Sequence, residues 1–171
     1  AFAAKVAVEP DFVARTAGCT PSGPADEPCF RSLASVLGRR MFRRPLATAE
    51  LDAYAAGILP HDETAGDFAF AVEMLTQLLV QHPLFLYRLE KSGGDLDAYE
   101  IATRMAYLLW GSGPDDELLD IAATSELSDA GKRVAQARRM LADERAKRQW
   151  ANFHAQWLGY VAAPLPDALA D

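Results

Sequence analysis

Apolar residues recur at intervals of three and four along most of this sequence, and no stretch shows the sustained alternation of a β-strand. Prolines, glycines and helix-capping residues interrupt the pattern at the points where helices are expected to start or stop. The sequence therefore predicts an all-α fold of about seven helices in a bundle, forming one compact unit or two small subdomains.

The first two predicted helices are bounded by prolines. The first follows Pro28 and ends before Pro45, because a residue that precedes proline disfavours helical geometry. Thr48 is expected to cap the second helix, and Pro60 to lie beyond its end, before a loop at His61.

The third predicted helix is apolar on most sides, which is typical of a helix at the centre of a bundle. Its main row consists of Phe68, Val72, Leu75 and Leu79. Pro83 ends this helix, and a short helix or an extended link is expected between there and Glu90.

Four more helices are predicted in the second half. Asp97 and Glu100 form a capping box at the start of the first, and Pro114 is placed in the first turn of the second. The last two span about residues 128–142 and 143–160. The residues predicted to face inward are Ile101, Met105, Leu108 and Leu109, then Val134, Ala137 and Leu141. In the last helix, one apolar row consists of Ala146, Trp150, Phe153 and Trp157.

The run Ser92-Gly93-Gly94 is the best candidate boundary in the middle of the chain. It predicts an N-terminal helical subdomain over residues 1–91 and a C-terminal one over residues 95–171.

Cys19 and Cys29 bracket a loop rich in proline, glycine and acidic residues. Such a loop allows the two sulfurs to meet, and a bridge would stabilise the fold by roughly 2 to 3 kcal/mol. No histidine or second cysteine pair lies nearby with metal-ligand spacing. The pattern favours a disulfide over two free thiols, and both over a metal site. A disulfide indicates a periplasmic or extracellular location.

The net charge of −7 argues against non-specific binding to nucleic acid or to anionic lipid, both of which need a basic surface. No apolar run approaches the roughly 18 to 20 residues of a transmembrane helix. The sequence has neither an initiator methionine nor a signal peptide, so we expect that a leader has been removed or that a longer protein contains this chain.

The densest concentration of charge is formed by Arg39, Arg40, Arg43 and Arg44. Arginine holds carboxylates and phosphates through paired hydrogen bonds, so an anionic ligand or partner is one interpretation. The position near a helix C-terminus favours the other interpretation, in which these residues form ion pairs and cap the helix.

His154 lies beside the apolar row of the last helix, which favours a core or interface role over a ligand or proton-transfer role. Residues 114–117 offer carboxylates for a cation, but they lack the alternation of a calcium loop, and helix-start chemistry explains them. The sequence contains no nucleophile elbow, phosphate loop, dinucleotide fingerprint or covalent-haem motif. No catalytic, cofactor-binding or metal-binding residue is predicted.

Several segments resemble, in chain order, the motifs of two consecutive bacterial domains of unknown function. They are RRMFRRPL (39–46), LLVQHPLFLYRLE (78–90), ATRMAYLLWGS (102–112), PDDELL (114–119), RMLAD (139–143) and NFHAQWL (152–158). Such domains occur in large exported proteins, many of which also carry planctomycete-type cytochrome c domains. The sequence departs from the usual pattern at His82, where a small polar residue is common.

The resemblance implies export, a bridge between Cys19 and Cys29, and a multidomain parent protein. It also implies c-type haem in partner domains, while the haem-attachment motif is missing from this chain. The family has no established catalytic residues to transfer, so no enzyme activity is assigned.

The favoured hypothesis is a non-catalytic helical scaffold or interaction module of an exported, cytochrome-associated assembly. Its partners would be other domains or chains, docked around Trp157, Leu158 and Tyr160. One alternative is part of a redox enzyme completed by other domains, with His154 or the arginines facing a shared cleft. A weaker alternative is a carbohydrate-binding module with Trp110 or Trp157 as its stacking platform.

Overall fold

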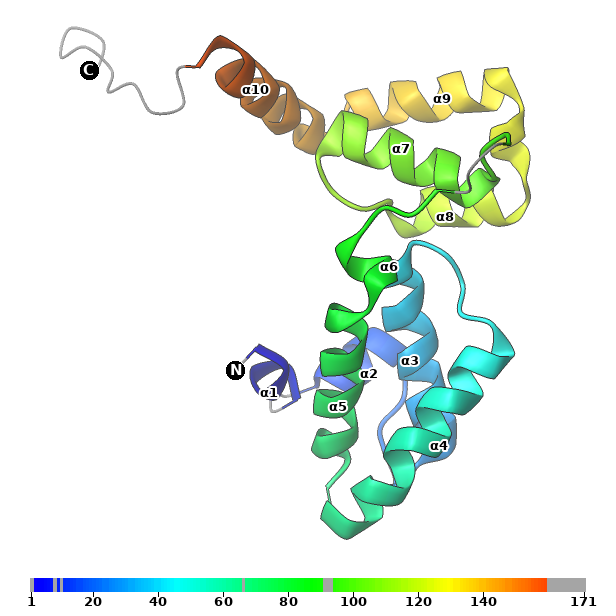
Figure 1. Ribbon diagram of the computed structural model, residues 1–171, viewed down its shortest axis with the longest axis vertical. Helices are drawn as coiled ribbons and strands as arrows, with labels where there is room; N and C mark the ends of the chain where they lie inside the picture. Colours follow the sequence, from blue (N-terminus) through cyan, green and yellow to red (C-terminus); the bar gives the residue numbers. More distant parts are fainter. Residues whose placement is uncertain (1, 8, 10, 66, 91–93, 160–171) are drawn as a thin grey trace, which may run out of the picture. The chain divides into compact units, whose positions relative to one another are not determined.

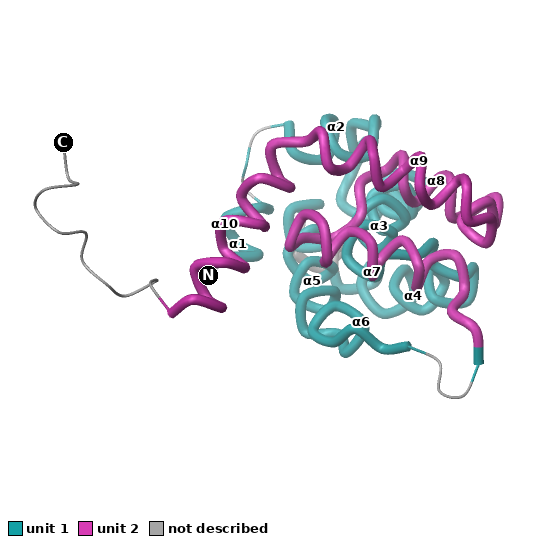
Figure 2. The backbone as a smooth tube through the Cα atoms, turned by 90° about the horizontal axis from the view of Figure 1, so that it is seen from above, with its two compact units in different colours: residues 1–94 teal, residues 95–171 magenta. Residues whose placement is uncertain are grey.

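The computed structural model describes residues 2–7, 9, 11–65, 67–90 and 94–159. These residues form ten α-helices and one 3-10 helix, with no strand among them, which confirms the all-α prediction. The chain divides into two compact units, residues 1–94 and residues 95–171, which Figure 2 shows in different colours. Ser92 and Gly93 of the predicted boundary lie outside the described residues.

Unit 1 is built around its fifth helix. Its helices are α1 (Phe2–Ala7), α2 (Phe12–Ala17), α3 (Glu27–Phe42), α4 (Thr48–Ala65), α5 (Phe68–Gln81) and α6 (Pro83–Leu86) (Figure 1). Helix α5 packs against α1, α3, α4 and α6, so its predicted central position is confirmed. Of the two alternatives expected after Pro83, a short helix or an extended link, the structure has a short helix, α6.

Helix α3 ends before Pro45 as predicted, but Pro28 lies in its first turn and not ahead of it; both ends carry local signals. Asp26 accepts a hydrogen bond from the Cys29 N–H (3.0 Å), and Pro28 lies in the first turn, where its missing N–H costs nothing. The helix ends at Arg43, which is left-handed (φ 59°). Gly38 allows the chain to return closely, since a Cβ there would lie 1.8 Å from Cδ1 of Leu46.

The predicted disulfide between Cys19 and Cys29 is present, with a Cα–Cα distance of 5.8 Å. It links the segment after α2 to the first turn of α3. A second connection lies beside it, where the Ser32 hydroxyl donates to the Ala17 carbonyl (3.0 Å). Together they hold α2 against α3.

Three expectations for unit 1 were wrong. Helices α1 and α2 were not predicted, because each is six residues long and Asp11, before α2, makes no side-chain cap. Helix α4 continues through Pro60 and His61, since the burial of Ile58 and Leu59 outweighs the local cost of proline. Thr48 is the first helical residue rather than the cap.

Unit 2 is arranged around α7. Its elements are α7 (Ala98–Trp110), α8 (Asp116–Ala123), the 3-10 helix η1 (Glu126–Ser128), α9 (Ala130–Leu141) and α10 (Glu144–Leu158). Helix α7 packs against α8, α9 and α10. The capping box is confirmed, since Glu100 N–H donates to Asp97 (2.9 Å) and Asp97 N–H donates to Glu100 (2.7 Å).

Several side chains of unit 2 face the opposite way from their prediction. Leu108, Val134 and Leu141 are exposed. Helix α7 instead turns its alanines inward, including Ala102 and Ala106, and small side chains allow neighbouring helices to approach. Of the four residues predicted to face inward in this helix, Leu109 is buried, Ile101 and Met105 pack against the core, and only Leu108 was misassigned.

The start of α8 also differs from its prediction. Pro114 lies two residues before the helix, and Asp115 caps it by accepting a hydrogen bond from the Leu118 N–H (2.9 Å). Asp115 is therefore the N-cap of α8, and Pro114 lies before the cap and not in the first turn of the helix.

Candidate interaction surface

Arg43 is buried and serves as an internal brace. Its guanidinium donates to the carbonyls of Met41 (3.2 Å), Leu84 and Tyr87 (3.0 Å). It therefore satisfies backbone acceptors around α6 from the end of α3, 41 and 44 residues away in sequence. This is a structural role, because the buried charge is already surrounded by acceptors.

Arg44 forms a two-pronged ion pair with Glu50 in the first turn of α4 (2.9 and 2.8 Å). Glu50 also accepts the N–H of Ala47 (2.7 Å), so this residue caps the helix in place of Thr48. The hydrogen bonds from Arg44 lower the pKa of Glu50 to about 2, against the opposing effect of burial.

Arg39 and Arg40 also have interaction partners. The structure therefore engages all four residues of the predicted arginine cluster within the fold. An anionic ligand of this cluster stays a prediction.

His82 performs the local task of a small polar residue. Its Nδ1 accepts the N–H of Leu84 (3.1 Å) and caps α6, while its ring packs 4.6 Å from the Phe42 ring, centroid to centroid. Small polar side chains cap helices by the same hydrogen bond. The departure at this position thus keeps the cap and adds an aromatic contact.

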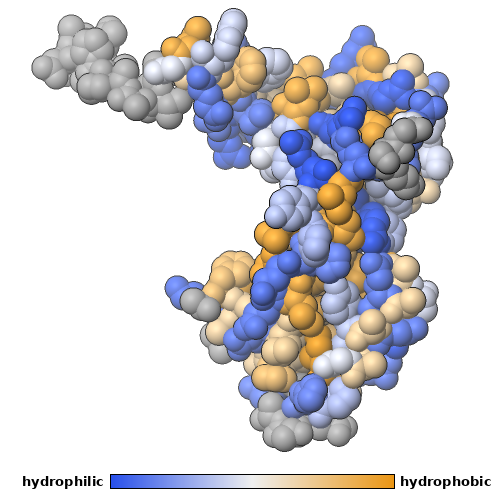
Figure 3. All heavy atoms as spheres, in the orientation of Figure 1, coloured by the Kyte–Doolittle hydropathy of each residue, from blue (hydrophilic) through white to orange (hydrophobic). Residues whose placement is uncertain are grey.

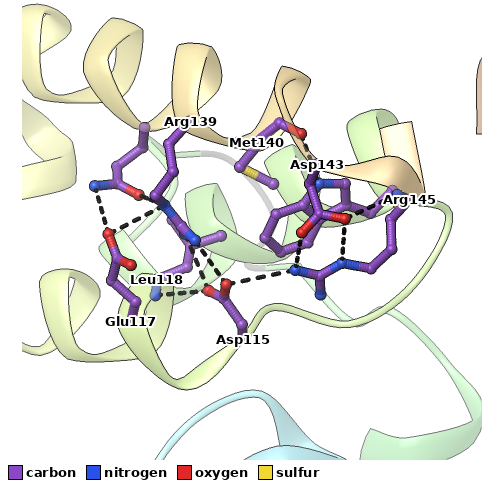
Figure 4. A network of polar contacts seen from close by, with 9 residues as sticks. Asp115, Glu117, Leu118, Arg139, Met140, Asp143 and Arg145 are labelled. Carbon is purple, nitrogen blue, oxygen red and sulfur yellow. Dashed lines mark hydrogen bonds and ion pairs between the residues drawn. The ribbon is translucent and has the colours of Figure 1, made fainter. Parts of the chain in front are cut away.

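A polar network surrounds Trp110 in unit 2, and Figure 4 shows it from close by. The indole N–H donates to the Met140 carbonyl (2.9 Å), and the indole ring is covered by the Arg145 guanidinium, 3.5 Å from the ring centroid. Asp115 receives two hydrogen bonds from Arg139 (2.8 and 3.1 Å). Asp143 receives two from Arg145 (3.0 and 2.7 Å).

The charges in this network determine its chemistry. Burial raises the pKa of Asp115, but hydrogen bonds from Arg139 and the Leu118 N–H outweigh it, so the pKa is lowered. Hydrogen bonds from the Arg145 side chain and N–H lower the pKa of Asp143 to about 2. Within residues 114–117, which offer carboxylates for a cation, Asp115 and Glu117 thus form ion pairs with Arg139. Trp110 is 5% exposed, which excludes it as a sugar-stacking platform.

Gly111 allows α10 to approach the end of α7 closely. Its φ of +65° ends α7, and a Cβ there would lie 2.2 Å from Oε1 of Gln149. The Gln149 side chain also lies 3.5 Å from the Tyr107 carbonyl. The first half of α10 is therefore fixed on α7, with Ala146 buried between them and the rest of the core.

The second half of α10 is held differently. It continues beyond the ends of α7 and α9, as both views show (Figures 1 and 2). Trp150, Phe153 and Trp157 are 43%, 50% and 71% exposed, and Leu158 is 62% exposed. Apolar and intermediate side chains accordingly lie on the surface along this helix (Figure 3). We call Trp150, Phe153, Trp157 and Leu158 the aromatic row.

The rings of the row contact one another without forming a flat platform. Phe153 and Trp157 are stacked (6.1 Å between centroids, 26° between planes), whereas Trp150 and Phe153 are edge-to-face (81°). Successive sugar rings would need coplanar partners, so the geometry favours a partner with an interdigitating surface.

His154 lies beside the row and is exposed. Its Nδ1 is 2.7 Å from the Trp150 carbonyl, an acceptor, so Nδ1 donates this hydrogen bond. The structure therefore brings together His154 and Trp157 among the predicted interaction residues. Tyr160 lies outside the described residues.

Two surface hollows were not indicated by the sequence. One, of about 530 Å³ in unit 1, is lined by residues that include Arg31, which pairs with Glu27 (2.7 Å) and Asp52 (2.8 Å). The other, of about 550 Å³ in unit 2, includes Arg133, which donates to the carbonyls of Leu127 and Ser128. Both arginines are already hydrogen-bonded within the fold.

Neither a metal centre nor a membrane span is found in the described part of the chain. No three His, Cys, Asp or Glu side chains gather there in a way that would hold a metal ion. None of the helices described is both long and apolar enough to cross a membrane.

The chain contains two consecutive domains of unknown function. Residues 29–90 match the family model described as PSD5, protein of unknown function (DUF1595), and residues 96–168 match PSD4, protein of unknown function (DUF1592). The first match lies in unit 1 and the second in unit 2. Comparison with curated proteins and with solved structures gave no match.

Proposed function

We propose that this chain is a non-catalytic helical interaction module of an exported multidomain protein, and that the aromatic row of α10 is its docking face. The observation that carries the proposal is the exposure of three aromatic side chains in one row of a helix whose other end is fixed in a core. Exposed apolar clusters of this kind mark interaction sites in soluble proteins.

The anchoring of α10 favours binding because it orders the row in advance. Arg145 on Trp110 and Gln149 on α7 hold the first half of the helix. A partner then meets aromatic side chains on an existing helix and does not have to order the backbone, which reduces the entropic cost of association.

The Cys19–Cys29 disulfide supports the exported location, because disulfides persist in oxidising compartments. In this proposal the partners are other domains or chains of the exported assembly. The association with c-type haem domains rests on the resemblance described above.

A photo-crosslinking experiment on the parent protein tests the docking face. A benzophenone amino acid replaces Trp157, and the control carries it at Val134, a half-exposed residue of α9. The proposal predicts crosslinks from position 157 either to another chain or to a segment of the same chain outside unit 2, identified by mass spectrometry of mixed isotope-labelled and unlabelled protein, and none at position 134. Crosslinks confined to unit 2 of the same molecule, or equal yields at both positions, would contradict it.

One observation favours a second function, as part of a redox enzyme completed by other domains. His154 fixes Nδ1 on the Trp150 carbonyl and leaves Nε2 accessible, the arrangement that metal-binding histidines adopt. An absorbance spectrum of the native assembly tests this candidate. A redox role predicts a haem absorbance band in the native assembly, and this band should shift in the variant His154→Gln. An unchanged spectrum would exclude a role for His154 as a haem ligand.

A further inference from the structure

We infer that the aromatic row is occupied by a second copy of this chain, related by a two-fold axis near Phe153, with the two α10 helices antiparallel. This inference rests on the proposed function, because it requires the row to be a docking face, and it specifies the partner.

Charge is the first argument. The chain carries a net charge of −7, so two copies repel one another over most of their surfaces. Residues 149–158 contain no Asp, Glu, Lys or Arg, and His154 is their one titratable side chain. Self-association therefore meets least repulsion on this segment. A partner selected by charge would find no charged group here to recognise, and charged residues are depleted at the centres of interfaces.

The second argument is that the surface is self-complementary. An antiparallel pair with its axis between residues 153 and 154 places Trp150 opposite Trp157 of the second copy, and it brings the two Phe153 side chains together beside the axis. A symmetric interface of this type uses the same patch on both chains. Asn152 and Gln156 are exposed beside the row, and their amides both donate and accept hydrogen bonds, so they too can pair across the axis.

The third argument is area. The exposed fractions of the four side chains correspond to roughly 400 to 500 Å² per copy, since an aromatic side chain buries about 150 to 250 Å² in full. Two copies would bury roughly 800 to 1,000 Å² in total, which is at the lower limit for a specific interface. The expected dimer is therefore weak and concentration-dependent.

Sedimentation velocity of the 171-residue chain between about 1 and 300 µM tests the inference. We expect the mass to rise from 18.6 kDa towards twice that value. Phe153→Lys and Phe153→Glu should each be monomeric at 300 µM, because each sets like charges against one another at the axis. Their equimolar mixture should dimerise again, since the opposed charges then attract. Val134→Lys, an equally exposed position on α9, should dimerise like the wild type.

The outcomes separate this inference from the proposed function. A wild-type chain that stays monomeric at 300 µM, a Phe153 variant that still dimerises, or a mixture that is not restored would overturn the second copy as occupant. Sedimentation of a monomeric chain with phosphatidylglycerol vesicles would overturn it in favour of a membrane surface. The docking face itself fails only if the crosslinks from position 157 stay within unit 2 of the same molecule.

Discussion

Helices α5 and α10 carry apolar rows with the same spacing and opposite surroundings. The row of α5 is Phe68, Val72, Leu75 and Leu79, and the row of α10 is Ala146, Trp150, Phe153 and Trp157; both step by four, three and four residues. The first is 7%, 1%, 0% and 0% exposed. In the second, only Ala146 is buried. The comparison teaches that a periodic apolar row predicts the face of a helix that is suited to packing. Whether other helices of the same chain cover that face depends on the neighbouring elements.

Truncation inside the α5 row should have the largest effect. Leu75→Ala removes a fully buried side chain and leaves a cavity, so we expect the free energy of unfolding to fall by about 2 to 5 kcal/mol. Urea unfolding followed by circular dichroism measures it. A loss below about 1 kcal/mol would mean that the α5 row is not the core that the comparison assumes.

Removal of the disulfide tests what holds α3 in that core. In the double variant Cys19→Ser with Cys29→Ser, the free energy of unfolding should fall by about 3 kcal/mol. Without the bridge, the unfolded chain regains the conformational entropy of the loop between these two positions, which are ten residues apart. Native-state hydrogen exchange should show the loss at amides of α2 and α3. Equal loss of protection in α7 would contradict a local role for the bridge.

The Arg44–Glu50 pair predicts acid sensitivity in unit 1. The folded pKa of Glu50 is about 2, below its usual 4.5, so its contribution is fully present above about pH 4.5 and is lost as the pH falls towards 2. Glu50→Gln should cost about 1 kcal/mol at pH 7, because the pair is partly exposed. The difference from the wild type should shrink between pH 4.5 and pH 2. A difference that is constant with pH would contradict this assignment.

The cap between α5 and α6 makes a smaller prediction. His82→Ala removes the acceptor of the Leu84 N–H and should cost about 1 kcal/mol, whereas His82→Ser restores a capping oxygen and should cost less. Thermal unfolding of the two variants measures the difference. Equal losses would show that the contact with Phe42, and not the cap, accounts for the role of His82.

The smallest stability effect is expected in the α10 row. Phe153→Ala should change the free energy of unfolding of the monomer by no more than about 0.5 kcal/mol, since the side chain is half exposed and outside the core. Urea unfolding at 1 µM provides the comparison with Leu75→Ala. A loss above about 2 kcal/mol would mean that the row is a core element of its own unit and would remove the contrast between the two helices.

Local signals were sufficient to predict much of the fold. The end of the first predicted helix before Pro45, the capping box of α7 and the apolar flanks of α5 each depend on residues within a short segment, and each was predicted correctly. The predicted second helix was too short, because tertiary packing keeps α4 helical through Pro60. Leu108 was misplaced because alanines formed the buried face of α7.

The candidate site was only partly accessible from the sequence. The exposed surface at Trp157 and Leu158 was predicted from the end of the last helix. The brace at Arg43 was not, since two of its acceptors, the carbonyls of Leu84 and Tyr87, are more than 40 residues away. The cover of Arg145 over Trp110 was also missed, because it joins helices distant in sequence. Interactions between remote residues leave no periodic pattern.

Acrylamide quenching of tryptophan fluorescence in Trp150→Phe tests the central claim most directly. This variant keeps the exposed Trp157 as its reporter and the buried Trp110 as a constant background. A docking face for a second copy predicts strong quenching at 1 µM and protection at 300 µM. Protection already at 1 µM, or equal quenching at both concentrations, would contradict the account.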